Sequence, residues 1–356
     1  MTTLSAPNRA PSRTPALPVV AGRLRGLASL RLTLGLIVVL AAAAIACAAD
    51  AVPATWALAL PLAGLAGNLA AAVATHPTFR RQTALLVFHL ALIAVALLAA
   101  AGRLTHLRGE VELSTGEAFP GRLVREVAGP LHRSRLDRVA FVNKGFAIDY
   151  SPGMRRGPTT NRVAWRASDG TWRQGVIGDQ TPLVLAGYRF YTTPNKGFAP
   201  LFEWQPAAGE PHRRGTIHLP AWPVNALRQA QQWTPPGARQ GIWMLLEIEE
   251  PVHAEDAAWV FRIPDRHRLV VHAHDGRHEL APGDSVALAE GRLRYTGLTS
   301  WMGYHVFHDW TLPWLLAAGI VAAGALAWHL ARRYAREPWD RPAVAGAAPN
   351  RTKETA

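Results

Sequence analysis

One histidine lies inside an apolar segment that is long enough to cross a bilayer. His89 is the single ionisable residue of residues 84–101, where every other side chain is hydrophobic. An ionisable side chain in lipid costs roughly 2–3 kcal/mol or more on insertion scales, so it usually faces a partner, a cavity or a cofactor. Imidazole is also a good ligand for iron, copper or zinc. The sequence therefore predicts a functional role for His89, with a plain hydrogen bond to a neighbouring helix as the alternative.

The depth of His89 in its segment favours haem as the ligand. If this span begins at Thr83, His89 lies roughly 9 Å into the membrane, because an α-helix rises about 1.5 Å per residue. An axial ligand of a haem held between helices needs a neutral imidazole in an apolar slot. We interpret His89 as a candidate axial ligand.

Three more histidines lie near the ends of the last apolar segment. His305 and His308 precede it, and a helical continuation would place both on one face, where they could bind a metal or haem. They could equally belong to an interfacial aromatic belt with the nearby tryptophans. His329 lies at the other end and could approach the same leaflet as His89, or it could anchor the helix at the interface beside its neighbouring arginines.

A predicted hairpin further along the chain also contains several histidines. With a two-residue turn at 275–276, His274 pairs with Arg277, and His272 and His278 face opposite sides. We therefore expect no shared zinc site there. The sequence also has no hydrolase nucleophile elbow, phosphate-binding glycine loop or HExxH helix, so it predicts no enzyme active site in this chain on its own.

Four apolar segments predict an integral membrane protein with three N-terminal transmembrane α-helices and one C-terminal one. Each approaches the ~20 residues that span the hydrocarbon of a bilayer. The expected organisation is a leader with an interfacial segment at 1–31, a three-helix bundle at 32–102 with spans at 32–49, 56–75 and 83–102, a β-rich extracytoplasmic domain at 103–311, a fourth helix at 312–330, and a tail at 331–356.

Membrane topology explains most of the net charge of +13. Residues 1–31, the loop after the second segment and the tail after the fourth together hold 13 basic and 3 acidic residues. All three regions lie on one side if the four segments span the membrane. The positive-inside rule then places both termini in the cytoplasm and the large domain outside it, in a bacterial inner (plasma) membrane. Nucleic acid is not an expected partner.

The large domain has the pattern of an antiparallel β structure. Short runs rich in β-branched and aromatic residues alternate with turn signals. The runs lie at 138–143, 146–150, 162–165, 182–185, 188–191, 243–248, 259–263 and 268–272. Residues 225–232 are a candidate short helix that divides the domain into two lobes.

The single cysteine, Cys47, limits the redox chemistry of the chain. It rules out an internal disulfide, a CxxC pair and a CxxCH haem-attachment site, although the domain is expected to face an oxidising compartment. The chain is therefore neither a thiol reductase nor a c-type cytochrome. Two further apolar segments follow the first at once, which favours a retained span over a cleaved signal peptide.

Several short motifs, taken in order, resemble one family. They are LASLRLT at 27–33, FHLAL at 88–92, GEVELSTGE at 109–117, FAIDYSPG at 146–153 and TPLVLAGYRFY at 181–191. Together with the arrangement of three spans and one, they resemble the ResB-like (Ccs-type) subunit of System II cytochrome c biogenesis over nearly the whole chain. The tryptophan-rich haem-handling motif of that system's other subunit is absent here.

The resemblance implies a membrane partner of the CcsA/ResC type. The two proteins would together export transiently bound b-type haem and deliver it to the CxxCH thiols of apocytochrome c, with a thioredoxin-like reductase of the same pathway as a further partner. His89 matches the family's intramembrane histidine, which is expected to ligate haem with a second histidine from the partner. Two rival hypotheses remain from the sequence: a haem- or metal-binding envelope sensor, and a structural scaffold in which His89 only packs.

Overall fold

The computed structural model describes residues 26–335 except 50, 168, 208, 210, 225, 226, 274 and 275. The chain forms two compact units. Met1–Leu104 and Trp310–Ala356 form the helical unit, and Thr105–Asp309 forms the β unit. Residues 1–25 of the predicted leader and most of the predicted tail lie outside the described residues.

In its described residues, the helical unit contains four helices that are long and apolar enough to cross a membrane, as the sequence predicts. The long helices are α2 (Leu30–Ala48), α3 (Ala54–Thr75), α5 (Thr83–Thr105) and α6 (Leu312–Tyr334), and the short α4 (Pro77–Arg81) joins α3 to α5. Each of the four long helices begins within two residues of its predicted start, because the edges of an apolar run mark where a span can leave the hydrocarbon.

A buried asparagine joins α2 to α3. The Asn68 side chain of α3 donates hydrogen bonds to the carbonyl oxygens of Leu27 (2.5 Å) and Ser29 (3.2 Å), and Thr33 donates to the Asn68 amide oxygen at 2.7 Å. These bonds satisfy carbonyl groups just before α2 begins, where water in the hydrocarbon is scarce. Gly64 allows the close approach, since a Cβ there would lie 3.0 Å from a methyl group of Leu36.

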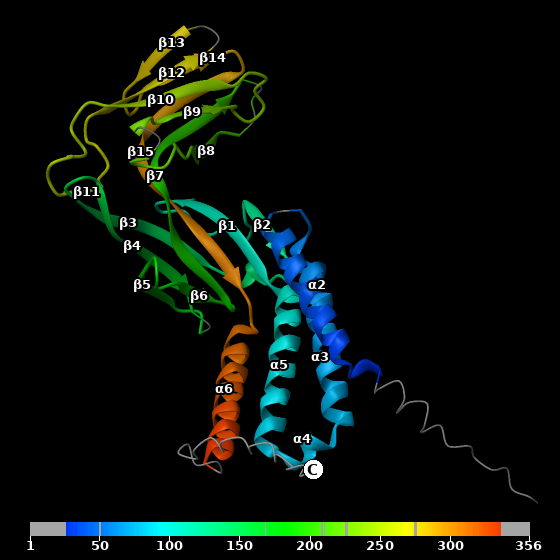
Figure 1. The fold of residues 1–356 in the computed structure, drawn as a ribbon. Helices are drawn as coiled ribbons and strands as arrows, with labels where there is room; N and C mark the ends of the chain where they lie inside the picture. The colour runs from blue at the N-terminus through cyan, green and yellow to red at the C-terminus, as the bar shows by residue number, and fades with distance from the viewer. Residues whose placement is uncertain are drawn as a thin grey trace, which may run out of the picture. The chain divides into compact units, whose positions relative to one another are not determined.

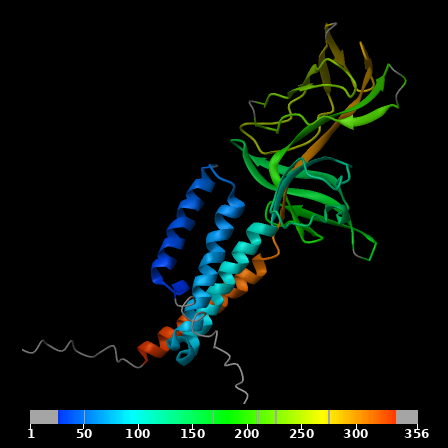
Figure 2. The same ribbon diagram turned by 90° about the vertical axis from the view of Figure 1, so that its right-hand side faces the viewer.

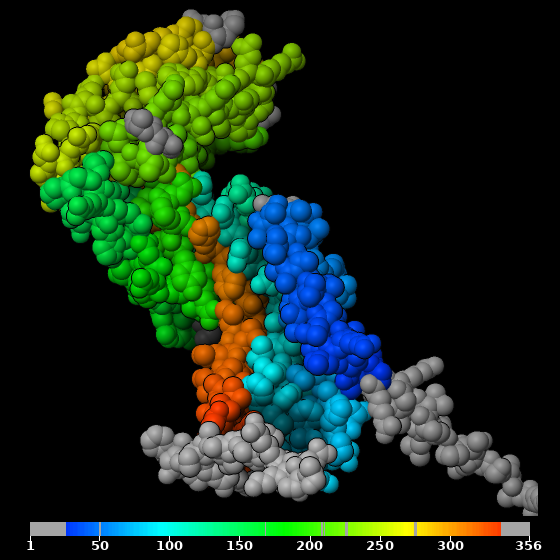
Figure 3. All heavy atoms as spheres, viewed as in Figure 1, coloured from blue at the N-terminus to red at the C-terminus, as the bar shows by residue number. Residues whose placement is uncertain are grey.

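The outer surface of α2 is apolar and open. No residue of this helix is buried, and Val38 and Ile45 are 67% and 72% exposed. Figure 3 shows this helix, in blue, uncovered in that view. Such a surface is expected to face lipid rather than water.

The β unit contains three sheets, in which every strand pairing of the described residues is antiparallel. The largest has the order β2-β1-β15-β7-β6, with β14 added to β15 and β8 to β7; the other two are β13-β12-β10-β9 and β11-β3-β4-β5. The strands of the largest sheet are β1 (Leu107–Ser114), β2 (Arg125–Ala128), β6 (Leu183–Leu185), β7 (Tyr188–Pro206), β8 (Arg213–Thr216), β14 (Ser285–Leu288) and β15 (Gly291–His308).

The two smaller sheets complete the unit. The first is built from β9 (Ala230–Trp233), β10 (Ile242–Ile248), β12 (His267–Ala273) and β13 (Gly276–Leu280), and the second from β3 (Phe141–Ser151), β4 (Arg155–Arg166), β5 (Trp172–Gly178) and β11 (Trp259–Val260).

Two long strands connect the two hydrophobic cores of the β unit. β7 and β15 run side by side through it, as Figures 1 and 2 show. Phe202 and Tyr295 belong to one core, and Phe190 and Tyr304 to the other. Register shifts between Tyr295 and Gly297 and between Met302 and Tyr304 bend the pair, as β-bulges do. The unit therefore has two lobes, but paired strands rather than a helix join them.

Two local predictions about the β unit are wrong. Ala230–Trp233 forms strand β9 on the edge of β10, where the sequence predicts part of a helix at 225–232; residues 225 and 226 lie outside the described residues. In the hairpin of β12 and β13, His272 pairs with Arg277 and His278 with Val271, so the pairing differs by two residues from the prediction. His272 and His278 still face opposite sides, because neighbouring strand residues alternate.

Candidate functional site

The backbone of α5 fixes the orientation of the His89 imidazole. The ring nitrogen Nδ1 lies 2.7 Å from the carbonyl oxygen of Leu85, one turn earlier in the helix. A carbonyl can only accept, so Nδ1 carries the proton and donates it. In the neutral ring, Nε2 then holds a lone pair. Among the described residues, no hydrogen-bonding partner occupies Nε2.

Aromatic side chains from two helices surround His89, which is itself half-buried. The Phe79 ring of α4 lies edge-on at 4.6 Å between centroids, and the Phe88 ring of α5 at 5.2 Å. The short α4 can bring Phe79 here because Pro77 starts a new helical turn directly after α3. The result is an imidazole in an apolar setting.

The His89 site fits one axial position of a haem. Metal-ligating histidines usually donate their second ring N–H to a carbonyl or carboxylate, which fixes the tautomer and ring orientation. The bond to Leu85 supplies this support, and Nε2 is the nitrogen left to bind iron. The apolar rings of Phe79 and Phe88 suit the flat, hydrophobic macrocycle of haem. Within the described residues, no group of three or more metal-ligating side chains comes together.

His329 of α6 is in the same unit but lines a different feature. It borders a cavity with Arg81, Arg332 and Arg333, and His89 is not among the residues that line this cavity. The guanidinium of Arg332 also lies over the Trp328 ring, at 4.7 Å from its centroid. His329 is therefore placed among cations rather than in the aromatic slot.

His305 and His308 do not form one site. Strand β15 continues through His308, so the helical continuation on which their common face depends does not form. Residues three apart in a strand face opposite sides. His305 is exposed and lies 3.6 Å from Glu110.

His308 packs in a ring cluster of the β unit. Its ring lies 5.1 Å from that of His132 and 4.8 Å from that of Tyr188, between centroids. Burial, and then the neighbouring His132, lower the pKa of His308 below its usual value. Its Nδ1 is buried without a hydrogen-bonding partner among the described residues. The lowered pKa favours the neutral ring at neutral pH.

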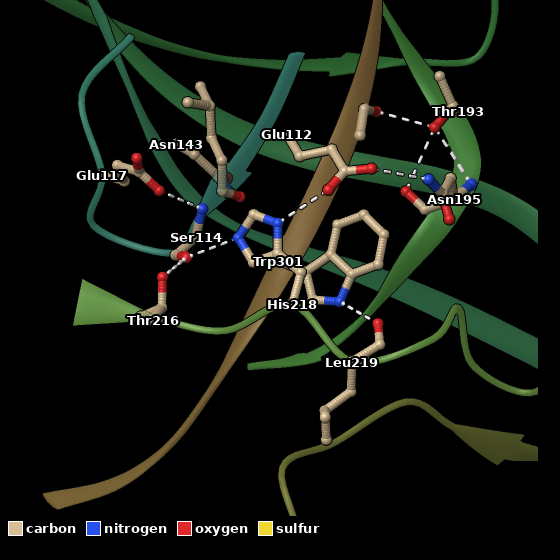
Figure 4. A network of polar contacts seen from close by, with 12 residues as sticks. Glu112, Ser114, Glu117, Asn143, Thr193, Asn195, Thr216, His218, Leu219 and Trp301 are labelled. Atoms are coloured by element: carbon tan, nitrogen blue, oxygen red, sulfur yellow. Dashed lines mark hydrogen bonds and ion pairs between the residues drawn. The ribbon is translucent and has the colours of Figure 1, made fainter. Parts of the chain in front are cut away.

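A polar network that the sequence does not reveal lies in the β unit (Figure 4). His218 connects two side chains of β1, since its Nδ1 lies 2.9 Å from a carboxylate oxygen of Glu112 and its Nε2 3.0 Å from Oγ of Ser114. The Ser114 hydroxyl also bonds Thr216 at 2.6 Å. The His218 ring stacks on Trp301 at 4.8 Å between centroids, with 6° between the planes.

The order Ser114–His218–Glu112 resembles the connectivity of a hydrolase triad, but its surroundings do not suit acyl transfer. The backbone N–H of Ser114 donates to the Glu117 carboxylate at 2.8 Å. The negatively charged Glu117 carboxylate therefore occupies the N–H group that would have to stabilise the oxyanion formed in acyl transfer. The network instead ties β1 to β15 and to the segment after β8. Glu112 and Ser114 share a strand face by alternation, whereas nothing in the sequence pairs them with His218.

Comparison with known proteins gives a family match and a distant structural similarity. A solved structure named Cytochrome c Heme Lyase CcmF aligns with 88% of this chain at 16% identity, and its TM-score of 0.26 is too low to indicate a shared fold. The chain covers 39% of that protein. No curated protein matches the sequence significantly. The model of the ResB-like family matches residues 66–291, more than half of the chain. The chain therefore belongs to the ResB-like family, the family of the Ccs subunit of System II cytochrome c biogenesis.

Proposed function

We propose that this chain binds haem through His89 and, with a CcsA/ResC-type membrane partner, delivers it to the CxxCH thiols of apocytochrome c. Membership of the ResB-like family supports a role in cytochrome c biogenesis and a membrane partner. The observation that carries the haem proposal is the His89 ring, whose Nδ1 is held by Leu85 and whose Nε2 has no described partner. Haem would supply the iron that binds Nε2 of His89 and the macrocycle that becomes attached to the CxxCH thiols.

The residues around His89 have separate roles in this proposal. The Leu85 carbonyl keeps the proton on Nδ1 and so keeps Nε2 ready to bind. Phe79 and Phe88 exclude water from the ring and limit its rotation. A histidine of the partner would hold haem together with His89, so haem would lie at the boundary of the two proteins.

Both termini would lie in the cytoplasm of a bacterial cell and the β unit outside it, because the basic residues of the sequence gather in the segments assigned to the inner side. The β unit would dock the partner or apocytochrome c, and a thioredoxin-like reductase of the pathway would keep the target thiols reduced.

The test is a ligand-replacement experiment on the complex. The chain would be co-expressed with its candidate CcsA/ResC-type partner and an apocytochrome c, as wild type, His89→Gly and His76→Gly, with and without added imidazole. His76 is a matched control, because it is an exposed histidine of the same unit. The measurements are the haem absorbance of the purified complex and the yield of covalent cytochrome c.

We expect His89→Gly to lose most of both signals and imidazole to restore them by filling the vacant ligand position. His76→Gly should match the wild type. Unchanged haem and yield in His89→Gly would overturn the assignment and leave a structural scaffold as the better explanation. A wild-type complex without haem absorbance would also contradict the proposal.

A further inference from the structure

A basic cavity lies in the helical unit where α4 and α5 meet the end of α6. Its volume is about 460 Å³. It lies at the start of α5 and the end of α6. Each of these two helices is joined to the β unit at its other end. Its polar lining residues are Arg81, Gln82, Thr83, His329, Arg332 and Arg333.

The charge of this cavity is uncompensated by the described residues. Arg81 comes from α4, whereas Arg332 and Arg333 come from the last turn of α6. No described acidic residue lines the cavity or forms an ion pair with these three arginines. Like charges that converge from separate helices repel each other unless an anion lies between them. The lining therefore selects for a negatively charged ligand.

The backbone adds to this preference. α5 begins at Thr83 and has no acidic residue in its first turn. The first N–H groups of an α-helix have no partner within the helix, and they carry its positive dipole end. Thr83 and Gln82 place this end of α5 on the cavity beside the guanidinium groups. Phosphate oxygens match both kinds of donor, because guanidinium forks and helix N-termini bind them well.

We propose that this cavity binds the phosphate of an anionic phospholipid headgroup. It opens at the ends of apolar helices, where headgroups of a bilayer lie. Trp328 and Arg332, stacked at 4.7 Å, are the kind of pair that anchors a helix at this depth. Basic pockets between transmembrane helices are a known form of lipid recognition. The site does not depend on haem binding by His89.

The carboxylates of haem are the other anions to consider, and the position of His89 disfavours them. Thr83 and Ala84 line the cavity. At about 100° per residue, His89 lies roughly 120–140° around α5 from both of them. Its ring contacts Phe79, whereas the cavity is lined by Arg81 of the same short helix. A macrocycle bound to His89 would therefore lie on a different side of α5.

The experiment measures lipid retention by the full-length chain. Wild type, Arg81→Gln, the double variant Arg332→Gln/Arg333→Gln and the control Arg80→Gln would be purified in a neutral detergent. Arg80 is exposed, neighbours Arg81 and does not line the cavity. Phosphatidylglycerol or phosphatidylcholine would be added, and bound lipid counted by native mass spectrometry. Glycerol phosphate serves as a competitor, and haem absorbance is recorded for each sample.

We expect wild type and Arg80→Gln to retain phosphatidylglycerol in preference to phosphatidylcholine. The double variant should bind it roughly 30-fold more weakly, since it loses two cations that each contribute about 1 kcal/mol near a membrane surface. Glycerol phosphate should compete only at far higher concentration, because it lacks the acyl chains. Equal loss in Arg80→Gln, or no preference between the lipids, would overturn the proposal. Loss of haem with unchanged lipid binding in the cavity variants would assign the cavity to haem carboxylates instead.

Discussion

The imidazole of His89 lies edge-on to the ring of Phe79, with 4.6 Å between the centroids and 63° between the planes. The two residues come from different helices, α5 and α4. The short helix between α3 and α5 is therefore more than a connection, because it supplies one wall of the slot around the candidate ligand.

Removing this wall should weaken haem binding without abolishing it. We expect Phe79→Ala to lower haem affinity by up to about tenfold, since an aromatic pair contributes about 0.5–1.5 kcal/mol beyond its buried area. Haem titration of the purified complex, followed by absorbance, measures the change. Leu90→Ala is the control, because Leu90 neighbours His89 and is 49% exposed. Equal weakening in both variants would argue against a specific role for Phe79.

The His218 network should stabilise the β unit. His218→Ala removes hydrogen bonds to Glu112 and Ser114 and the stack on Trp301. We expect the free energy of unfolding to fall by about 1–3 kcal/mol, because two hydrogen bonds and a ring stack are lost together. Denaturant unfolding of the full-length chain, followed by tryptophan fluorescence, measures this. The exposed His212 provides the control His212→Ala, and a loss of the same size there would remove the network explanation.

A buried lysine should make stability depend on pH. Lys196 is 2% exposed, and burial lowers its pKa from 10.5 to about 8, with Arg156 adding to the effect. Between pH 8 and about 10.4 the unfolded chain binds more protons than the folded one, so the free energy of unfolding rises with pH in this window. Below pH 8 the penalty is constant, because both states are protonated.

Lys196→Met should remove this dependence. We expect the variant to be more stable than wild type at pH 7 by about 1–3 kcal/mol, with loss of the bond from Nζ to the Thr193 carbonyl offsetting part of the gain. Unfolding curves at pH 7, 8, 9 and 10 give the comparison. The exposed Lys144 provides the control Lys144→Met, which should keep the wild-type slope. A slope that survives in Lys196→Met would contradict the assignment.

Asn68 should hold α2 on α3. Asn68→Leu removes the hydrogen bonds that connect this side chain to Thr33 and to the carbonyl groups of Leu27 and Ser29. We expect a loss of about 0.6–2 kcal/mol, as measured for hydrogen bonds between membrane helices. Unfolding in SDS, followed by circular dichroism, reports the change. Thr75→Val is the control, because Thr75 bonds only Ala71 of its own helix in the described residues. Similar losses in both would exclude a special role for the contact between helices.

The sequence predicts the helices of this chain better than its strands. Four apolar runs are enough to predict four spans, since lipid leaves a helix few alternatives. The run at 188–191 predicts only the start of β7, which continues through Pro194 and Pro200 to Pro206. None of the predicted runs falls in β15, because register shifts between Tyr295 and Gly297 and between Met302 and Tyr304 interrupt the alternation that marks a strand.

For the candidate site as well, the sequence predicts what depends on neighbouring residues and does not predict contacts between distant ones. The sequence identifies His89 from its apolar neighbours, but its bond to Leu85 and contact with Phe79 require the structure. The pairing of His305 with His308 fails, because it assumes a helix where β15 continues. His218 cannot be connected to Ser114 from sequence, since 104 positions separate them and no spacing rule links a strand to a distant loop.

The ladder that pairs Leu107 with His308 joins the first strand of the β unit to its last. A ribosome adds about 5–20 residues per second, so β1 waits roughly 10–40 s for the residues of β15 to be synthesised. β2 can cover one edge of β1 early, but the other edge stays open throughout. During each round of synthesis, the growing chain therefore presents an unpaired strand to chaperones and to other nascent chains.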